Sequence, residues 1–198
     1  MSETRSYPRR VTTEAGEIEF QLMTRTDEAA VLDFAQKLPT HDLLFLPRNI
    51  SQPKVLSAWI NEIERGDIVS LLAVTQGVVV GCGTLVKDSH SWSPHVGEIR
   101  MVVSLEVRGQ GVGRALSQEI FALALGAGLE KLSVQMTVDQ HAAIALFEGL
   151  GFRAEALLRE HVRDADGQKH DIVVLGHNVA QVRAQLEAYG LPGAVMPS

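Results

Sequence analysis

A glycine-rich segment between an apolar strand and an amphipathic helix most constrains the fold of this chain. It reads Arg108-Gly109-Gln110-Gly111-Val112-Gly113-Arg114. The strand-like run Val96–Val103 precedes it, and a run with apolar residues at helical spacing, 112–127, follows it. The first N–H groups of a helix have no acceptor inside it, the helix dipole adds partial positive charge there, and glycines let a ligand approach the backbone. The segment therefore predicts a site for an anion such as a pyrophosphate.

Two other phosphate motifs do not match this segment. A Rossmann dinucleotide site needs Gly-x-Gly-x-x-Gly, but the position three residues after Gly111 is Arg114. A P-loop needs Gly-Lys-Ser or Gly-Lys-Thr, and neither occurs here. A glycine-rich turn that binds no ligand stays open as an alternative.

The pattern Arg-x-x-Gly-x-Gly resembles the pyrophosphate-binding motif of the GNAT acetyltransferases. A second segment carries the same resemblance. About thirty residues after the first motif, this family usually shows a strand followed by Asn-x-x-Ala-x-x-x-Tyr-Glu-x-x-Gly-Phe. The corresponding residues are Gln140-His141-Ala142-Ala143-Ile144-Ala145-Leu146-Phe147-Glu148-Gly149-Leu150-Gly151-Phe152. The resemblance covers about residues 68–177. Two motifs at this spacing are more specific than either one alone.

The resemblance implies an α/β fold with a mixed, mostly antiparallel central sheet of about seven strands and flanking helices. The fourth and fifth strands, Val96–Val103 and 131–138, should be parallel and splayed, with acyl-CoA held in the gap. Periodicity and turn residues predict further strands at 17–23, 68–75, 78–87, 152–162 and 171–177, and helices at 27–37, 53–65, 141–150 and 179–189. Asp27 and Asp139 are expected to cap two of these helices. We expect an N-terminal arm (1–16), a single domain (17–190) and a C-terminal tail (191–198).

The resemblance also implies a cofactor and its contacts. Acetyl-CoA would be the co-substrate, and no metal would be needed. Backbone groups of residues 101–103 would bond the pantetheine arm, and backbone N–H groups of residues 109–114 would hold the pyrophosphate. The residues expected at the cofactor are Met101, Val102, Val103, Arg108, Gly109, Gln110, Gly111, Val112, Gly113, Arg114, Gln140 and Phe147.

Two of these residues depart from the family pattern. Gln140 replaces the usual Asn and keeps amide chemistry. Phe147 replaces the usual Tyr, which is thought to protonate the departing CoA thiolate. Phe has no proton to give, so Phe147 is expected to pack beside the cofactor without a catalytic role.

The attacking ammonium must lose a proton, and Glu98 is the candidate base. Strand alternation places Glu98 on one face with Arg100 and Val102, and a solvated or Arg100-paired Glu98 is the alternative. His161 and Asp171 are the next candidates. Other side chains are expected around the acceptor channel: His41 and Asp42 in its wall, and His90, Trp92 and His95 at its mouth.

These features predict an N-acetyltransferase that moves the acetyl group directly to the amine of a small molecule, an amino acid or a protein. A catalytically degenerate acyl-CoA-binding module that regulates a partner is the alternative, which Phe147 makes conceivable. The sequence does not decide whether the protein is a monomer or a homodimer.

Composition excludes several other classes. The net charge of -6 and the sequence pI near 5.6 argue against sequence-independent binding to the phosphate backbone of DNA or RNA. The single cysteine, Cys82, cannot form an intrachain disulfide or a cysteine metal cluster and is expected in the core. No apolar run reaches the roughly 20 residues of a membrane span. Because residues 2–16 also do not resemble a signal peptide, we expect a cytoplasmic protein without membrane partners.

Overall fold

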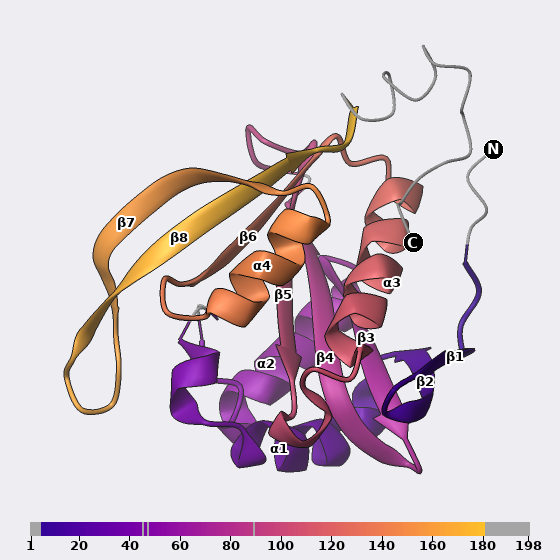
Figure 1. The fold of residues 1–198 in the computed structure, drawn as a ribbon. Coiled ribbons are helices and arrows are strands. Elements are labelled where there is room, and N and C mark those ends of the chain that lie inside the picture. The colour runs from indigo at the N-terminus through magenta and orange to yellow at the C-terminus, as the bar shows by residue number, and fades with distance from the viewer. Residues whose placement is uncertain (1–4, 45, 47, 89, 181–198) are drawn as a thin grey trace.

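Eight strands form one sheet in the order β1-β2-β3-β4-β5-β6-β8-β7 (Figure 1). The computed structural model describes residues 5–44, 46, 48–88 and 90–180. The strands are β1 (Arg9–Thr13), β2 (Gly16–Leu22), β3 (Ile68–Thr75), β4 (Val78–Lys87), β5 (Val96–Val103), β6 (Lys131–Thr137), β7 (Arg153–Arg163) and β8 (Lys169–Asn178). The helices are α1 (Glu28–Lys37), α2 (Pro53–Arg65), α3 (Val112–Gly126) and α4 (His141–Gly149), with short 3-10 helices η1 (Arg25–Asp27), η2 (Thr40–Leu43) and η3 (Leu105–Val107).

Parallel pairing in this sheet occurs between β5 and β6. It runs from Val96 opposite Lys131 to Ile99 opposite Val134. β5 then continues to Val103 and β6 to Thr137, while the two strands diverge (Figure 1). The expected mixed sheet with two splayed parallel strands is therefore confirmed.

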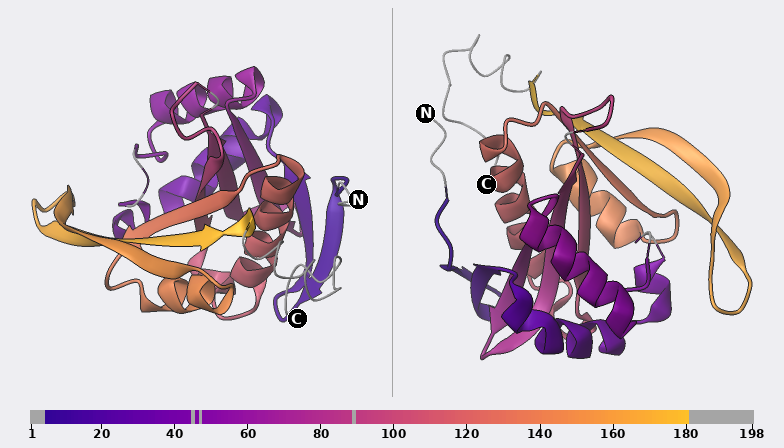
Figure 2. Two further views of the ribbon diagram at one scale, coloured as in Figure 1. Left: turned by 90° about the horizontal axis from the view of Figure 1, so that it is seen from above. Right: turned by 180° about the vertical axis from the view of Figure 1, so that it is seen from behind.

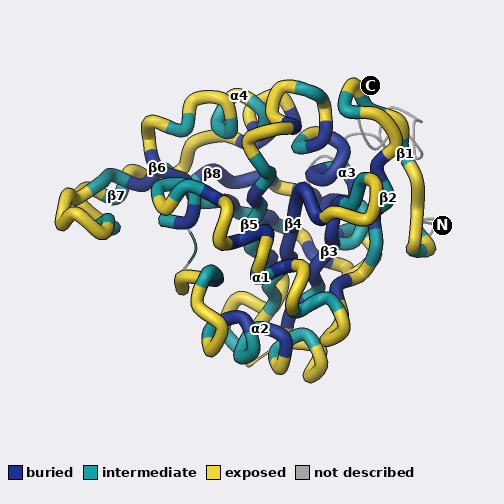
Figure 3. The backbone as a smooth tube through the Cα atoms, turned by 90° about the horizontal axis from the view of Figure 1, so that it is seen from below, coloured by how far each residue is buried: buried dark blue, intermediate teal, exposed yellow. Residues whose placement is uncertain are grey.

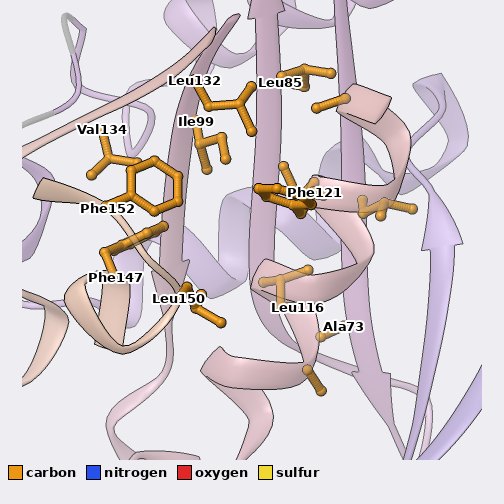
Figure 4. Close-up of a cluster of buried hydrophobic side chains, with 14 of the residues drawn as sticks. Ala73, Leu85, Ile99, Leu116, Phe121, Leu132, Val134, Phe147, Leu150 and Phe152 are labelled. Atoms are coloured by element: carbon orange, nitrogen blue, oxygen red, sulfur yellow. The ribbon is translucent and has the colours of Figure 1, made fainter. Parts of the chain in front are cut away.

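Helices cover both faces of the sheet. On one face, α3 and α4 enclose a cluster in which Leu116, Ile120 and Phe152 are almost fully buried (Figure 4). On the opposite face, α1 and α2 bury Val31 and Ile60 in a second cluster, and Figure 2 shows these two helices in front when the molecule is seen from behind. The sheet thus separates an α3/α4 face from an α1/α2 face.

The approach of α3 to the sheet requires a glycine. A Cβ on Gly83 of β4 would lie 2.9 Å from Cγ1 of Ile120, closer than real Cβ contacts. Glycine at this position lets α3 pack directly on the middle of the sheet, which fixes the position of its N-terminus relative to β5.

Burial falls off sharply from the centre of the sheet to its β7 edge. Residues of β3 and β4 are mostly buried, whereas nearly all of β7 is exposed (Figure 3). Most of β7 pairs with β8 alone in a hairpin that extends beyond the body of the molecule (Figure 1). β7 is shifted by one residue from the predicted 152–162, and β8 extends beyond the predicted 171–177 at both ends, because exposed polar residues give a weak strand signal.

The N-terminal residues differ most from the sequence prediction. A loose arm is predicted over residues 1–16, but Arg9–Thr13 pairs with β2 in an antiparallel ladder. The arm is anchored at Glu119 of α3, whose side chain is 4% exposed and lies 2.7 Å from Arg5 and 3.2 Å from Arg9. The prediction is wrong there because these charged residues find their partners on a helix far along the chain.

The two predicted helix caps have different outcomes. Asp27 is the N-cap residue of α1 as predicted, but its carboxylate accepts the N–H of Thr24 at 2.8 Å and makes no cap bond to the helix. The prediction for the second cap is wrong. Asp139 lies one residue before the N-cap of α4, Gln140, and its carboxylate pairs with His41 instead. The predicted closing helix, 179–189, lies almost entirely outside the described residues, as does the tail 191–198. Within the described ranges, no helix is long and apolar enough to cross a membrane.

Candidate functional site

The glycine-rich loop leads into the N-terminus of α3 as predicted. Gly109 and Gly111 adopt left-handed backbone angles, with φ of 74° and 84°, which glycine adopts without strain. The Ala115 N–H donates to the Gly111 carbonyl at 3.0 Å, and no side chain caps the helix. The N–H groups of residues 112–114 therefore form the unbonded positive end of α3, which suits an anion.

Gly113, in the first turn of α3, packs between the end of β5 and the side of α4. A Cβ there would lie 3.6 Å from Cδ2 of Leu146 on α4 and 3.8 Å from Cγ2 of Val103 at the end of β5. The start of α3, the end of β5 and the side of α4 thus meet around this glycine. A ligand bound at the helix N-terminus would continue directly into the gap between β5 and β6.

Arg108 and Gln110 bond within the protein. The Arg108 guanidinium donates to the Val103 carbonyl, at 3.2 Å from Nε and 3.0 Å from Nη2, and Nη2 also lies 2.6 Å from Asp42. The Gln110 side-chain amide donates to the Glu106 carbonyl at 2.7 Å. The N–H groups of Arg108 and Gln110 also have backbone acceptors. The backbone of the glycines and of the first turn of α3 is therefore better placed to bind a pyrophosphate than the side chains or N–H groups of Arg108 and Gln110.

Among the described residues, the last residues of β5 have no strand partner on the β6 side, although the Val103 carbonyl accepts the Arg108 guanidinium. Met101 and Val103 pack on the α3/α4 face, whereas Val102 lies in the cluster on the α1/α2 face. The β4–β5 ladder is regular from Gly81 opposite Val103 to Lys87 opposite Gly97, so no bulge disturbs this alternation. Beyond Ile99 the edge of β5 is not paired with β6 and can bond an extended ligand as a further strand would.

Glu98 is held by an ion pair. Its carboxylate accepts bonds of 2.9 Å from Nε and 3.0 Å from Nη2 of Arg100, and both side chains are about three-quarters buried. Glu98 also lies opposite Ser133, where β5 and β6 are still paired. Its role as the base stays a prediction.

The two residues that depart from the family motif lie at opposite ends of α4. Gln140 is the N-cap residue, and its N–H donates to the Thr137 carbonyl at 3.0 Å. Phe147 is 4% exposed and packs edge-on against Phe152, with ring centroids 5.2 Å apart (Figure 4). The Phe147 ring therefore belongs to the hydrophobic core of the α3/α4 face.

A cavity of about 300 Å³ lies between α2 and strands β4 and β5, on the α1/α2 face. Val55 and Trp59 contribute apolar surface to it, and Arg48 and Glu62, 3.1 Å apart, contribute an ion pair. Met101 and Val102 form part of its wall, so it adjoins the free part of β5. The sequence did not reveal this cavity, because its lining comes from three separate segments.

Histidines and carboxylates gather where β6 ends. Nε2 of His41 lies 2.8 Å from Asp139, and the His41 ring meets the His170 ring edge-on at 5.1 Å. Nε2 of His170 lies 2.7 Å from Asp164, and this hydrogen bond lowers the pKa of the Asp164 carboxyl. Desolvation raises the pKa of Asp139, but hydrogen bonds from Thr137 and the backbone, together with the His41 and His170 charges, leave it lowered.

Several residues expected near the acceptor lie elsewhere. His90, Trp92 and His95 belong to the exposed loop before β5, at the opposite end of that strand from the splay. Asp171 accepts the Glu160 N–H at 2.7 Å and is thereby used within the β7–β8 hairpin. Among the described residues, no group of three or more His, Cys, Asp or Glu side chains is arranged to hold a metal ion.

Comparison with known proteins decides the family. The profile of the acetyltransferase (GNAT) family matches residues 34–152, which is more than half of the chain. The chain belongs to the GNAT acetyltransferase family. The matched region of this GNAT chain contains the glycine-rich loop, both diverging strands and α4, but not His170 and Asp164.

Individual relatives agree with this assignment. The chain is 36% identical over 94 residues to the IAA acetyltransferase of Azospirillum brasilense, covering 47% of this chain and 60% of that protein. The GNAT-family acetyltransferase of Streptococcus pneumoniae superposes with a TM-score of 0.70 at 18% identity, covering 81% of this chain and 99% of that one. The acetyltransferase yncA of Salmonella typhimurium, solved with its cofactor acetyl-CoA, gives 0.69 at 18% identity, covering 82% and 94%. The structural matches show the fold, and the matched region spans less than two thirds of that curated relative.

Proposed function

We propose that this protein transfers the acetyl group of acetyl-CoA directly to the nitrogen of an acceptor amine. The divergence of β5 from β6 directly beside the N-terminus of α3 is the observation that carries the proposal. It offers a free strand edge for the pantetheine amides and unbonded N–H groups for the pyrophosphate at the positions that one extended ligand needs.

Some residues would bind the cofactor, and others would also polarise its thioester carbonyl. The backbone of residues 109 and 111–114 would hold the pyrophosphate, and the edge of Met101–Val103 would orient the pantetheine and polarise the thioester carbonyl. Gln140, at the start of α4, would contact the cofactor arm. Phe147 would support the same wall through packing, and the CoA thiolate, a good leaving group, would depart without a phenol to protonate it.

The acceptor is expected to approach from the α1/α2 face. The cofactor residues lie on the α3/α4 side of the sheet, whereas the cavity beside Trp59 and Arg100 opens on the other side of β5. Its mixed apolar and charged lining suits an amine with an apolar body. Small amines, amino acids and protein amines can all carry such a body, so all three are included as acceptor classes.

Release of free thiol from acetyl-CoA across a panel of amines tests this proposal. The panel should contain apolar and aromatic amines, free amino acids and peptides with free N-termini. Amine-dependent release supports the transferase. Binding of acetyl-CoA without release against the whole panel would support the alternative, an acyl-CoA-binding module that regulates a partner.

A further inference from the structure

The short helix η2 connects the ends of both diverging strands. Its residue Asp42 bonds Arg108, and Arg108 in turn bonds the Val103 carbonyl where β5 ends. The preceding residue, His41, lies 3.4 Å from the Thr137 hydroxyl, the last residue of β6, and 2.8 Å from Asp139. Two consecutive residues of η2 therefore span the open end of the gap between β5 and β6.

This position is on the acceptor side of the sheet. η2 belongs to the segment between α1 and α2, and its Leu43 packs in the cluster of the α1/α2 face together with Val102. The cofactor loop and α4 approach the same gap from the other face. A group on η2 thus meets the gap from the side on which an attacking amine would enter.

The hydrogen bonds of His41 leave one ring nitrogen available. Nε2 lies against the Asp139 carboxylate, so in the neutral ring Nε2–H donates to Asp139 and Nδ1 keeps its lone pair. No bond to Nδ1 occurs within the described part of the chain. The side chain is 35% exposed, so a small molecule can reach it.

Charged and titratable groups face His41 from β6, β8 and η2. Asp139 faces it from the end of β6, and the His170 ring faces it from β8 with its own Nε2 directed to Asp164. On the η2 side, the Asp42 carboxylate is neutralised by Arg108. A carboxylate that orients a histidine and stabilises its cation is the arrangement that makes an effective general base.

We propose that His41, oriented by Asp139, takes the proton of the acceptor amine in the transfer reaction. The proposal rests on the proposed function. Nδ1 of His41 takes one proton from the acceptor ammonium, and this frees the nitrogen lone pair to form the N–C bond at the thioester carbonyl carbon. The C–S bond then breaks with its electron pair on sulfur, giving the CoA thiolate. The second proton lost by the nitrogen passes to that thiolate and the proton on His41 passes to solvent, so the reaction needs no further reactant.

This assignment competes with Glu98. Both carboxylate oxygens of Glu98 are occupied by Arg100, and Glu98 lies in the paired part of β5. His41 lies beyond the paired part, beside the residues that end β5 and β6. Asp139 acts through His41 and is therefore a positioning residue.

The test compares His41→Gln, Asp139→Asn, Glu98→Gln and the matched control His90→Gln. His90 is a histidine in the loop at the far end of β5, where the same substitution cannot affect the gap. For each full-length variant, kcat is measured against pH with one saturating amine, and acetyl-CoA affinity is measured by calorimetric titration. Free imidazole is added to a His41→Ala variant as a second readout that does not depend on the Gln substitution.

His41→Gln should lower kcat about a hundredfold at neutral pH, with acetyl-CoA affinity unchanged. The loss should shrink at high pH, where the free amine is abundant. Asp139→Asn should lower kcat less than His41→Gln does. A double variant that carries both His41→Gln and Asp139→Asn should have a kcat no lower than that of His41→Gln alone. Imidazole should restore part of the activity of His41→Ala.

A His41→Gln profile that overlays wild type, or a hundredfold loss in Glu98→Gln alone, would overturn the assignment while leaving the transferase intact. A uniform loss at all pH values without imidazole rescue would also overturn it, because it would show that His41 only holds η2 in place. Wild type that acetylates no amine would overturn the proposed function and this inference together.

Discussion

A Cβ placed on Gly113 would lie 3.8 Å from Cγ2 of Val103, so the first turn of α3 packs directly against the end of β5. The larger side chain of a Gly113→Val variant should therefore push these two elements apart and disturb the proposed pyrophosphate site. Loss of the charge-assisted bonds to the pyrophosphate should cost about 3 kcal/mol, or roughly a hundredfold in acetyl-CoA affinity. Calorimetric titration with acetyl-CoA measures this loss of affinity.

Gly126→Ala is the matched control for this variant. Gly126 is the last residue of the same helix, and a Cβ there would meet nothing within 4 Å. It should bind acetyl-CoA normally and be about 0.5–1 kcal/mol more stable. Gly111→Val is a poorer test, because a side chain at its φ of 84° would strain the backbone. Normal affinity in a folded Gly113→Val variant would remove the cofactor site from this loop.

Phe147 is expected to act through packing alone. Phe147→Ala should reduce the free energy of unfolding by about 3–5 kcal/mol, because it leaves a cavity beside Phe152. Phe147→Tyr buries a hydroxyl and should cost about 1–3 kcal/mol unless it finds a partner. Turnover per folded molecule should be kept or raised in Phe147→Tyr. Denaturant unfolding and kcat, measured on the same samples, separate the two effects, and a large loss of kcat in a stable Phe147→Tyr variant would contradict this role.

Glu119 should hold the N-terminal strand on α3. Its buried carboxylate pairs with Arg5 and Arg9 and accepts the Tyr7 hydroxyl at 3.1 Å. Burial, followed by the Glu119 charge, raises the pKa of Tyr7 above its ordinary value. Glu119→Gln should cost about 1–3 kcal/mol and speed amide hydrogen exchange over residues 9–13. Glu148→Gln, which changes an exposed carboxylate on α4, should change neither, and unchanged exchange in Glu119→Gln would show that the β1–β2 ladder alone holds the strand.

The Cys82 thiol should be inert in the folded protein. Burial raises its pKa to about 12, against about 8.5 for an unfolded thiol, with only a small opposing effect from Thr84. Because the folded pKa is the higher one, its contribution to stability is complete below about pH 8.5 and is lost as the pH rises toward 12. Wild type should therefore lose stability faster than Cys82→Ala in that window. Rapid reaction of the native thiol with a thiol reagent at neutral pH would contradict this.

The elements around the site could be predicted from sequence, because their signals are local. The boundaries of β3, β4 and β5 follow from apolar runs and the Gln76-Gly77 turn, and α3 follows from the glycine loop and its apolar stripe. The second family motif predicts Gln140 at the start of α4 and Phe147 within it.

The parts that could not be predicted depend on contacts between distant residues. β1 was missed because Arg9 and Arg10 resemble a solvated arm until Glu119 and Glu19 come beside them. The sequence predicts His41 in the wall of the acceptor channel and Asp139 as a helix cap. Their pairing comes from the placement of η2 across the end of β6, and no spacing within the chain reveals it.

The most direct test of the account follows both products of the reaction in one sample. Wild-type protein, acetyl-CoA and the best amine of the panel are incubated together, and free CoA thiol and acetylated amine are both quantified over time. The buried Cys82 should not contribute to the thiol signal. The account predicts that thiol and acetylated amine rise in equal amounts and that neither rises without the amine. Thiol release without acetylated amine, or acetyl-CoA binding with neither product, would contradict it.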